Sequence, residues 1–260
     1  MKRSLLGLCL LAVALVLGVP RRAAAEDLSA DQIADRIIRG NGFTWEGAHT
    51  RLRMTLTDAS GQKTERTLDV LGRRKDGRLA SKVEFLSPPD VAGTKFLSLE
   101  KEGGGTQQYI YLPGLKRTRR ISGRDQEGSF MGSDFTYSDL ARKDDTGAKH
   151  VKLPDESVGN DATYVVESTP AQVQENGYSK VRAWVRKTDF VALRTKFYDA
   201  SGKLVKTLYV KKVRDMDGKP VVVEATMKSE SGHSTDLAVD SLDKRADIPD
   251  SEFSPTSLER

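Results

Sequence analysis

Hydrophobic and polar residues alternate with a period of two along most of this chain. From His49 to Thr57, leucine and methionine fall on one side of a predicted strand, and arginine and threonine fall on the other. The same alternation, bounded by turns rich in glycine and aspartate, predicts further strands in the first half at residues 63–71, 79–86, 94–99 and 107–112. In the second half it predicts strands at residues 164–167, 181–186, 191–198, 204–213, 221–228 and 235–242.

Helical patterns are few. Ser29 and Gln32 have the spacing of a capping box, and three isoleucines then fall on one face of a helix predicted at residues 29–39. Gly40 and Gly42 end this helix. A second short helix is expected near residues 127–141 and a turn after Ser251. Ten or eleven strands in hairpin order therefore predict a mainly β fold, with a single antiparallel sheet curved into a half-open barrel whose mouth the short helices cover.

The first 25 residues have the features of a cleaved secretory signal peptide. Lys2 and Arg3 precede an apolar run from Leu5 to Val19, and the alanines that end at Ala25 supply small residues for cleavage. The run is short for a membrane span, although an uncleaved anchor is the alternative reading. We therefore expect a signal peptide at residues 1–25 and one domain at residues 26–260.

Charge and cysteine content narrow the choice of partner. The formal net charge of +5 falls to +1 when the four basic residues of the leader are removed, because the leader holds no acid. A nearly neutral domain is not expected to bind nucleic acid. The single cysteine, Cys9, lies in the leader, so the mature domain has no disulfide. No other apolar run is long enough for stable membrane insertion of the mature chain.

The stretch from Tyr109 to Leu140 does not follow the pattern of a simple hairpin. It breaks at Pro113 and Gly114, and glycines then punctuate a segment that carries large apolar side chains. One reading is a pliant apolar lip over a cavity, and the other is a short helix packed on the sheet as core. The cations in this stretch fit either a solvated edge or a contact with anionic headgroups or a partner protein; they are Lys116, Arg117, Arg119 and Arg120.

Catalytic and metal-binding patterns are weak. The three histidines, His49, His150 and His233, are far apart and have no second ligand at metal spacing, so we expect no metal and no cofactor. Asp134 and Asp139 are the one pair of acids near the predicted mouth of the barrel. Since nothing else in the sequence supports their use as an acid pair, the chain is not predicted to be an enzyme.

Several motifs, in their order along the chain, resemble a known family. They are Pro-Pro-Asp at 88–90, Tyr-Ile-Tyr-Leu-Pro-Gly at 109–114, Gly-Ser-Phe-Met-Gly-Ser-Asp-Phe at 128–135, Trp-Val-Arg-Lys at 184–187, Phe-Tyr-Asp-Ala-Ser-Gly at 197–202 and Ile-Pro-Asp-Ser-Glu-Phe at 248–253. Together they resemble the LolA-like outer-membrane lipoprotein-sorting proteins, in the branch associated with efflux-type lipid transporters.

The resemblance implies a LolA/LolB-like half-open barrel with a helical lid. It implies a periplasmic carrier that shields acyl chains of lipoproteins or lipids and works with an inner-membrane transporter of the RND or MMPL type. It also implies a cation that bonds the lid closed, for which no position in this sequence is matched. The candidates for lipid contact are Met54, Phe85, Phe96, Tyr109, Tyr111, Phe130, Met131, Phe135, Trp184 and Phe197.

Two alternatives to a carrier remain open at this point. One is a non-catalytic envelope module that binds a protein or a glycan on its sheet surface. The other, less favoured, is a hydrolase that uses acids near Asp134.

Overall fold

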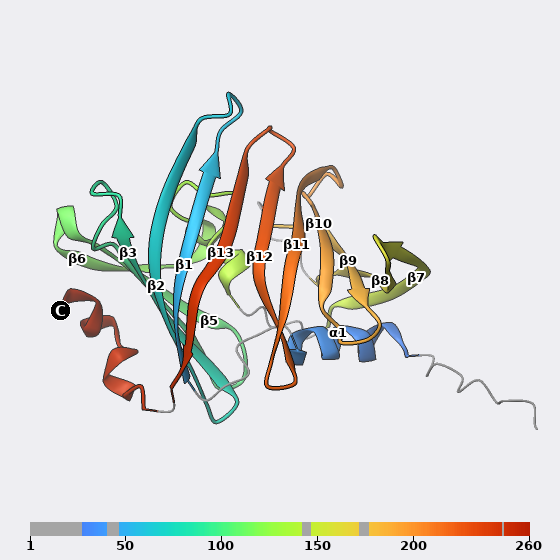
Figure 1. Cartoon of the computed structure of the whole chain (residues 1–260), viewed down its shortest axis with the longest axis horizontal. Helices are drawn as coiled ribbons and strands as arrows, with labels where there is room; N and C mark the ends of the chain where they lie inside the picture. The colour runs from blue at the N-terminus through green and yellow to red at the C-terminus, as the bar shows by residue number, and fades with distance from the viewer. Residues whose placement is uncertain (1–27, 41–46, 142–146, 172–176, 246) are drawn as a thin grey trace, which may run out of the picture.

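The computed structural model describes residues 28–40, 47–141, 147–171, 177–245 and 247–260. Its strands form one antiparallel sheet of thirteen strands that does not close on itself (Figure 1). The strands of the first half are β1 (Gly47–Thr57), β2 (Lys63–Lys75), β3 (Arg78–Ser87), β4 (Lys95–Glu100), β5 (Thr106–Leu112) and β6 (Arg117–Ile121). Those of the second half are β7 (Lys149–Val158), β8 (Asp161–Thr169), β9 (Lys180–Arg186), β10 (Ala192–Tyr198), β11 (Leu204–Met216), β12 (Lys219–Ser229) and β13 (Ser234–Lys244).

The strands follow one another across the sheet as a meander in two halves. The first half runs from β1 outward to β6, and the second runs from β13 outward to β7. The halves join where β1 pairs with β13, with Met54 opposite Leu237. The two ends of the sheet are therefore β6 and β7, which is the open antiparallel sheet predicted from the alternation.

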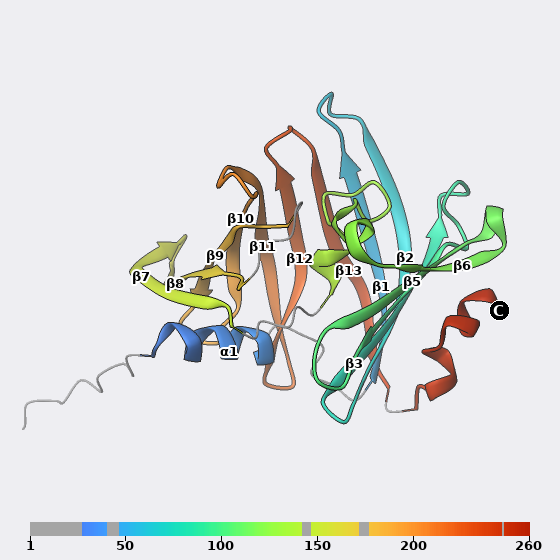
Figure 2. The same ribbon diagram turned by 180° about the vertical axis from the view of Figure 1, so that it is seen from behind.

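Different segments of the chain cover the two faces of the sheet. We call the face that bears residues 122–141 and helix α1 (Ala30–Gly40) the inner face, and the opposite one the outer face. Figure 2 shows the sheet curving around these two segments. The inner face holds the largest apolar cluster, to which β1, β2, β3, β4, β5 and β12 each contribute buried residues. No helix among the described residues is long and apolar enough to cross a membrane.

Helix α1 begins as the sequence predicts. The Ser29 N–H donates to Gln32 Oε1 at 2.8 Å, and the Gln32 N–H donates to Ser29 Oγ at 3.2 Å, which confirms the capping box. The buried Ile33 then packs on the inner face against Tyr164 and Val185, on β8 and β9. This helix covers the inner face at the end of the sheet formed by β7, β8 and β9.

The C-terminal segment covers part of the outer face. It contains two short 3₁₀ helices, η4 (Asp250–Glu252) and η5 (Pro255–Glu259), where a turn was expected after Ser251. Ile248, Phe253 and Leu258 are buried against the outer side of β2 to β5. The Lys82 ammonium group forms an ion pair with Glu252, which fastens the segment to β3.

Two strands at the edges were not predicted, and one predicted helix is absent. The edge strand β6 has a single apolar residue, Ile121, and the edge strand β7 contains Pro154, so neither alternates as a half-buried strand does. The helix expected near residues 127–141 is wrong. Two 3₁₀ helices, η2 (Gly123–Glu127) and η3 (Ser138–Leu140), flank a tight turn there, because Met131 and Gly132 have positive φ angles of 52° and 77°. The predicted signal peptide at residues 1–25 lies outside the described residues, as does Gly42.

Candidate functional site

The segment at residues 122–141, which we call the lid, places its aromatic rings on the inner face. Phe130, Phe135 and Tyr137 are 3%, 8% and 8% exposed. The Phe130 ring lies 5.7 Å from that of Phe85 and 5.2 Å from that of Phe96, measured between ring centroids, and the second pair meets edge to face. The lid therefore fills the surface that a half-open barrel would offer to an apolar ligand.

Seven of the ten predicted lipid-contact residues come together in this cluster. Five are buried in it, and two are partly buried and pack against it. They come from the strands β1, β3, β4 and β10 and from the lid, which are far apart in the sequence. The seven are Met54, Phe85, Phe96, Phe130, Met131, Phe135 and Phe197.

The other three predicted contacts lie on the outer face, so their expected place in one cavity with the rest is wrong. Tyr109 pairs with Leu97 across β4 and β5, and both pack with Tyr111 under the C-terminal segment. Trp184 points away from its neighbour Val185, which packs on helix α1. Its indole N–H donates to Glu156 at 2.8 Å. Alternation along a strand identifies its two faces. It does not show which face packs against the lid and which packs against the C-terminal segment.

The predicted cations lie at one end of the sheet. Lys116 has a positive φ of 46° in the turn before β6 and is exposed. Arg117, Arg119 and Arg120 are exposed on β6 itself, on alternate faces, as expected for a strand that is not half-buried. Arg119 lies 3.5 Å from the Asp125 carboxylate. This geometry agrees equally with a solvated edge and with a contact surface.

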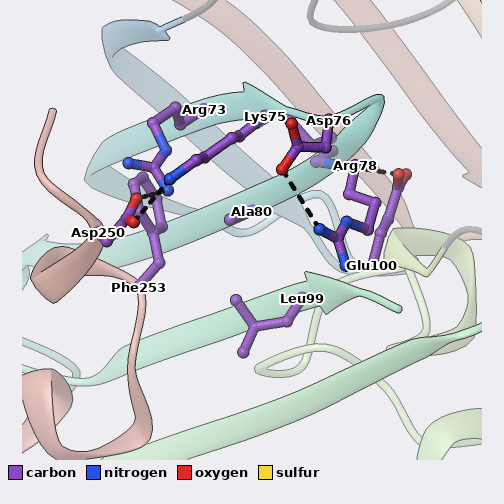
Figure 3. Close-up of a pocket in the computed structure, with 10 residues that line it drawn as sticks. Arg73, Lys75, Asp76, Arg78, Ala80, Leu99, Glu100, Asp250 and Phe253 are labelled. Carbon is purple, nitrogen blue, oxygen red and sulfur yellow. Dashed lines mark hydrogen bonds and ion pairs between the residues drawn. The ribbon is translucent and has the colours of Figure 1, made fainter. Parts of the chain in front are cut away.

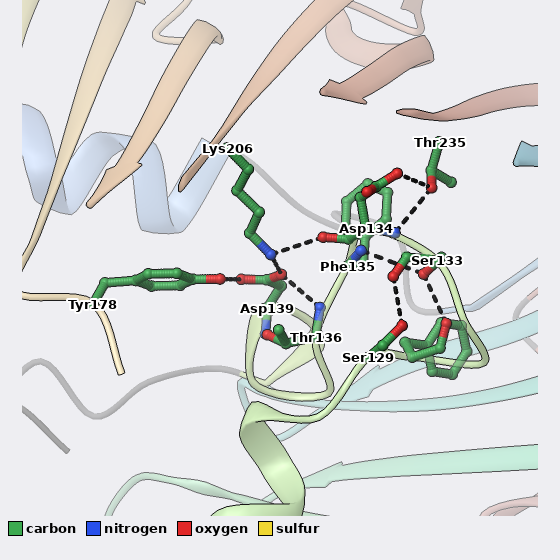
Figure 4. A network of polar contacts seen from close by, with 10 residues as sticks. Ser129, Ser133, Asp134, Phe135, Thr136, Asp139, Tyr178, Lys206 and Thr235 are labelled. Carbon is green, nitrogen blue, oxygen red and sulfur yellow. Dashed lines mark hydrogen bonds and ion pairs between the residues drawn. The ribbon is translucent and has the colours of Figure 1, made fainter. Parts of the chain in front are cut away.

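A buried ion pair joins the lid to the sheet. Lys206 on β11 points to the inner face, and its Nζ donates to the Asp134 carbonyl at 2.8 Å and to an Asp139 carboxylate oxygen at 2.5 Å (Figure 4). The Asp139 carboxylate also accepts from the Thr136 N–H at 2.7 Å and from the Tyr178 hydroxyl at 2.9 Å. The ammonium group and the carboxylate therefore have partners in the closed arrangement.

Three more strands hold the lid through polar contacts. On β13, Thr235 Oγ1 donates to the Asp134 carboxylate at 2.7 Å and accepts from the Asp134 N–H at 2.9 Å. On β5, the buried Gln108 side-chain amide donates to the Tyr137 carbonyl at 2.7 Å. On β2, the Arg66 guanidinium donates to the Met131 carbonyl. The lid is thus hydrogen-bonded to the sheet at its turn, through Met131 and Asp134, and near its end, through Tyr137.

Burial changes the protonation behaviour of two of these groups. It raises the pKa of Tyr178 far above its ordinary value, and the charge of Asp139 adds to the effect. The phenol therefore stays a neutral hydrogen-bond donor to Asp139 throughout the physiological range. Burial lowers the pKa of the Arg66 guanidinium, since desolvation disfavours its charge.

Asp134 and Asp139, the acid pair considered in the sequence, are both hydrogen-bonded to other side chains. Asp139 is bound by Lys206 and Tyr178, and Asp134 is bound by Thr235. Over the part of the chain that the structure describes, no group of histidine, cysteine, aspartate and glutamate side chains has the arrangement of a metal site. These contacts assign the two acids to holding the lid.

A pocket of about 330 Å³ opens on the outer face, between the β2–β3 hairpin and the C-terminal segment (Figure 3). Ion pairs line it: Lys75 lies 3.0 Å from Asp250, and Arg78 lies 3.5 Å from Asp76. Six of its ten lining residues are charged, and the others are Leu79, Ala80, Leu99 and Phe253. Because charged side chains surround this pocket, it does not suit an acyl chain.

Sequence reasoning missed the polar residues that hold the lid. Lys206 and Arg66 occupy positions in phase with Leu208 and Leu68, on the apolar side of their strands. A cation on the apolar side of a strand is the signal that could have identified them. A buried charge needs a partner, so such a cation predicts a carboxylate or carbonyl group that packs on that side. Their partners in the lid could not be named from the sequence, since the lid was expected to be helical.

The chain is similar to several known proteins. A family model described as "uncharacterized protein" matches residues 77–260. A domain assigned as an outer membrane lipoprotein-sorting protein from Vibrio parahaemolyticus is 30% identical, with 89% of this chain and 98% of that chain covered and a TM-score of 0.81. A DUF1329 family protein from Desulfovibrio piger is 27% identical, with 88% and 99% covered and a TM-score of 0.80.

A more distant structure shares the fold. A LolA-superfamily protein from Nitrosomonas europaea is 21% identical, with 87% of this chain and 98% of that chain covered and a TM-score of 0.68. No curated protein sequence matches the chain. The resemblance read from the motifs and the folds of these structures therefore agree.

Proposed function

Because this chain belongs to the LolA-like family of outer-membrane lipoprotein-sorting proteins, we propose that it is a periplasmic carrier for acyl chains of lipoproteins or lipids. The acyl chains bind on the inner face of the sheet, and the lid closes that face when no cargo is bound. The chain performs no catalysis in this role.

The observation that carries the proposal is the filling of the inner face by the lid's own rings. Phe130, Phe135 and Tyr137 lie against Phe85 and other apolar side chains of the sheet. Each methylene of a cargo buried in their place contributes about 0.8 kcal/mol, so a long acyl chain can compensate for their displacement. A hydrogen bond to a charged group contributes about 1.5–3 kcal/mol, so two to four buried methylenes of cargo offset each such contact of the lid that opens.

Lys206 and Arg66 are assigned the role of the cations that bond the lid closed. Both reach from the sheet to the lid backbone, to the carbonyls of Asp134 and Met131 respectively. Met131 holds a positive φ of 52°, a conformation that costs a non-glycine residue about 1 kcal/mol. This strain at the tip lowers the cost of opening the lid there.

The family and the predicted leader support the proposed compartment and partner. The predicted signal peptide at residues 1–25 would export the chain to the periplasm. An inner-membrane transporter of the RND or MMPL type would load or unload it. The exposed cations Lys116, Arg117, Arg119 and Arg120 would contact anionic headgroups or that transporter during transfer.

The test is native mass spectrometry of the protein purified from a bacterial periplasm without detergent, followed by lipid extraction and by loading with a fluorescent fatty acid. We expect bound acylated species and saturable uptake of the probe. Replacing Phe130 and Phe135 with Asp should lower retention, whereas Val151→Asp, at an exposed position on the edge strand β7, should not. A mass without lipid together with no uptake of the probe would contradict the carrier.

A further inference from the structure

A second surface with its own chemistry lies on the outer face, across β9 to β12. The register places Trp184, Arg194, Tyr209 and Thr226 side by side in one row across these four strands. The next row on the same face runs through Arg182, Lys196, Thr207 and Lys228. This surface is opposite the inner face that the proposed carrier uses.

Cations in this surface lie over aromatic rings. The Arg194 guanidinium carbon is 4.0 Å from the centre of the Trp184 ring, and Lys196 Nζ is 5.6 Å from the same ring. Lys180 lies over Tyr198 at 4.8 Å, and Lys211 lies over Tyr209 at 5.3 Å. Such contacts hold the charged groups in place on the sheet without neutralising them.

The charges of this surface are unbalanced, in contrast to those on the outer face of the first half of the sheet. On β1, Arg51 contacts Asp69 and Arg53 lies 3.0 Å from Asp240. On β3, Lys82 pairs with Glu252.

Three carboxylates contact cations of this surface: Glu167 on β8, Glu156 on β7 and Glu224 on β12. Glu167 binds Lys180 and Arg182, Glu156 lies 3.6 Å from Arg194, and Glu224 lies 3.4 Å from Lys212. Within the described ranges, no ion pair is formed by Lys196, Lys211 or Lys228. We call the six cations the cationic patch: Lys180, Arg182, Arg194, Lys196, Lys211 and Lys228.

We propose that the cationic patch is a docking surface for an acidic segment of a partner protein. Charge complementarity selects the partner, because the six cations of the patch outnumber the two carboxylates that contact them, Glu167 and Glu156, while Glu224 is paired with Lys212. The guanidinium groups of Arg182 and Arg194 and the ammonium groups beside them suit rows of carboxylates.

The same geometry disfavours a lipid bilayer as the occupant. Trp184 is 4% exposed beneath Arg194, so its ring is not available to enter a membrane. The cationic patch lies on the outer face and is therefore separate from any cargo on the inner face.

The experiment measures binding of a fluorescein-labelled oligoglutamate peptide by anisotropy, at low and high ionic strength. We expect saturable binding that weakens as salt rises, because these charges are exposed to screening. The triple variant Lys196→Glu, Lys211→Glu and Lys228→Glu should weaken binding at least about tenfold. A matched variant with Lys63→Glu, Lys101→Glu and Arg214→Glu carries the same change in net charge and should bind as the parent does.

Thermal unfolding of both triple variants checks that each is folded. Equal loss of binding in the two variants would mean that peptide binding depends only on the net charge of the protein, and it would overturn the proposal. Binding to vesicles of anionic phospholipid without binding to the peptide would also overturn it, in favour of a membrane. Lipid retention on the inner face should be the same in both variants, so failure of the carrier proposal would be seen separately.

Discussion

Lys206 on β11 and Asp139 in the lid form an ion pair in which the ammonium nitrogen is 2.5 Å from the carboxylate, and their side chains are 8% and 7% exposed. The two residues are 67 positions apart in the chain. The pair is the most buried ionic contact between lid and sheet, and it connects the inner-face aromatic cluster to the polar network shown in Figure 4.

Replacing Lys206 with Met should cost about 3–5 kcal/mol of unfolding free energy, because the Asp139 carboxylate would remain buried without its cation. The double variant Lys206→Met with Asp139→Asn should be more stable than Lys206→Met alone, since no uncompensated charge remains. Urea denaturation followed by circular dichroism measures both. A cost below about 1 kcal/mol for the single variant would show that the pair is solvated in solution.

A reversible lock of the lid should block acyl loading. Asp134 and Thr235 contact each other across the lid and β13, and the one cysteine of the chain, Cys9, lies in the predicted signal peptide. Asp134→Cys with Thr235→Cys should form a disulfide under oxidising conditions, reduce uptake of a fluorescent fatty acid severely, and recover on reduction.

Each single cysteine variant of that pair serves as the control and should load under both conditions. Full loading by the oxidised double variant, with the disulfide confirmed by mass, would mean that cargo enters without movement of the lid.

The C-terminal segment should loosen in acid before the sheet unfolds. Hydrogen bonds from Lys75 and Arg73 lower the pKa of Asp250, and a hydrogen bond from Lys82 lowers that of Glu252. A carboxylate with a lowered folded pKa stabilises the fold above its ordinary pKa, here 3.8 for Asp250 and 4.5 for Glu252, and that stability is lost as pH falls through the folded value.

Hydrogen exchange of residues 248–260 between pH 6 and pH 3 measures this loosening, with about one pH unit between samples. The variant Glu252→Gln should exchange faster already at neutral pH and should depend less on pH. If the segment stayed equally protected from exchange down to pH 3, Asp250 and Glu252 would not be the groups that hold it on the sheet.

Glycine at position 116 should stabilise the protein slightly. Lys116 is exposed with a φ of 46°, which costs a residue with a side chain about 1 kcal/mol. We expect Lys116→Gly to raise the melting temperature by a few degrees. Arg117→Gly, at the neighbouring extended position of β6, should lower it, because glycine gains only chain entropy in the unfolded state there. The opposite order of the two melting temperatures would contradict the strain assigned to Lys116.

Much of the sheet could be predicted from local pattern. The alternation on β1, with Met54 facing inward, and the capping box at Ser29 are both confirmed, because each depends on residues a few positions apart. The edge strands escaped the same reasoning. Ile121 is the one apolar residue of β6 and the only one of its five residues that is buried, so this edge strand shows no alternation.

The lid shows where pattern fails. Its large side chains were correctly expected to belong with Phe85 and Phe96, but a helix was expected to carry them. The left-handed backbone at Met131 breaks any helix, and it persists because the Arg66 guanidinium holds the Met131 carbonyl from β2. A residue in this conformation depends on contacts that local sequence does not encode.

The order of hydrophobic and polar residues by itself determined that the chain forms hairpins, that they make one antiparallel sheet, and that the sheet has an apolar side. Those properties arise from neighbours along a strand and from the turns between strands. The tertiary structure alone decided that Tyr109 lies under the C-terminal segment, that Trp184 lies beneath Arg194, and that Lys206 meets Asp139. Each of these depends on segments brought together from distant parts of the chain, where burial makes charges and polar groups find partners.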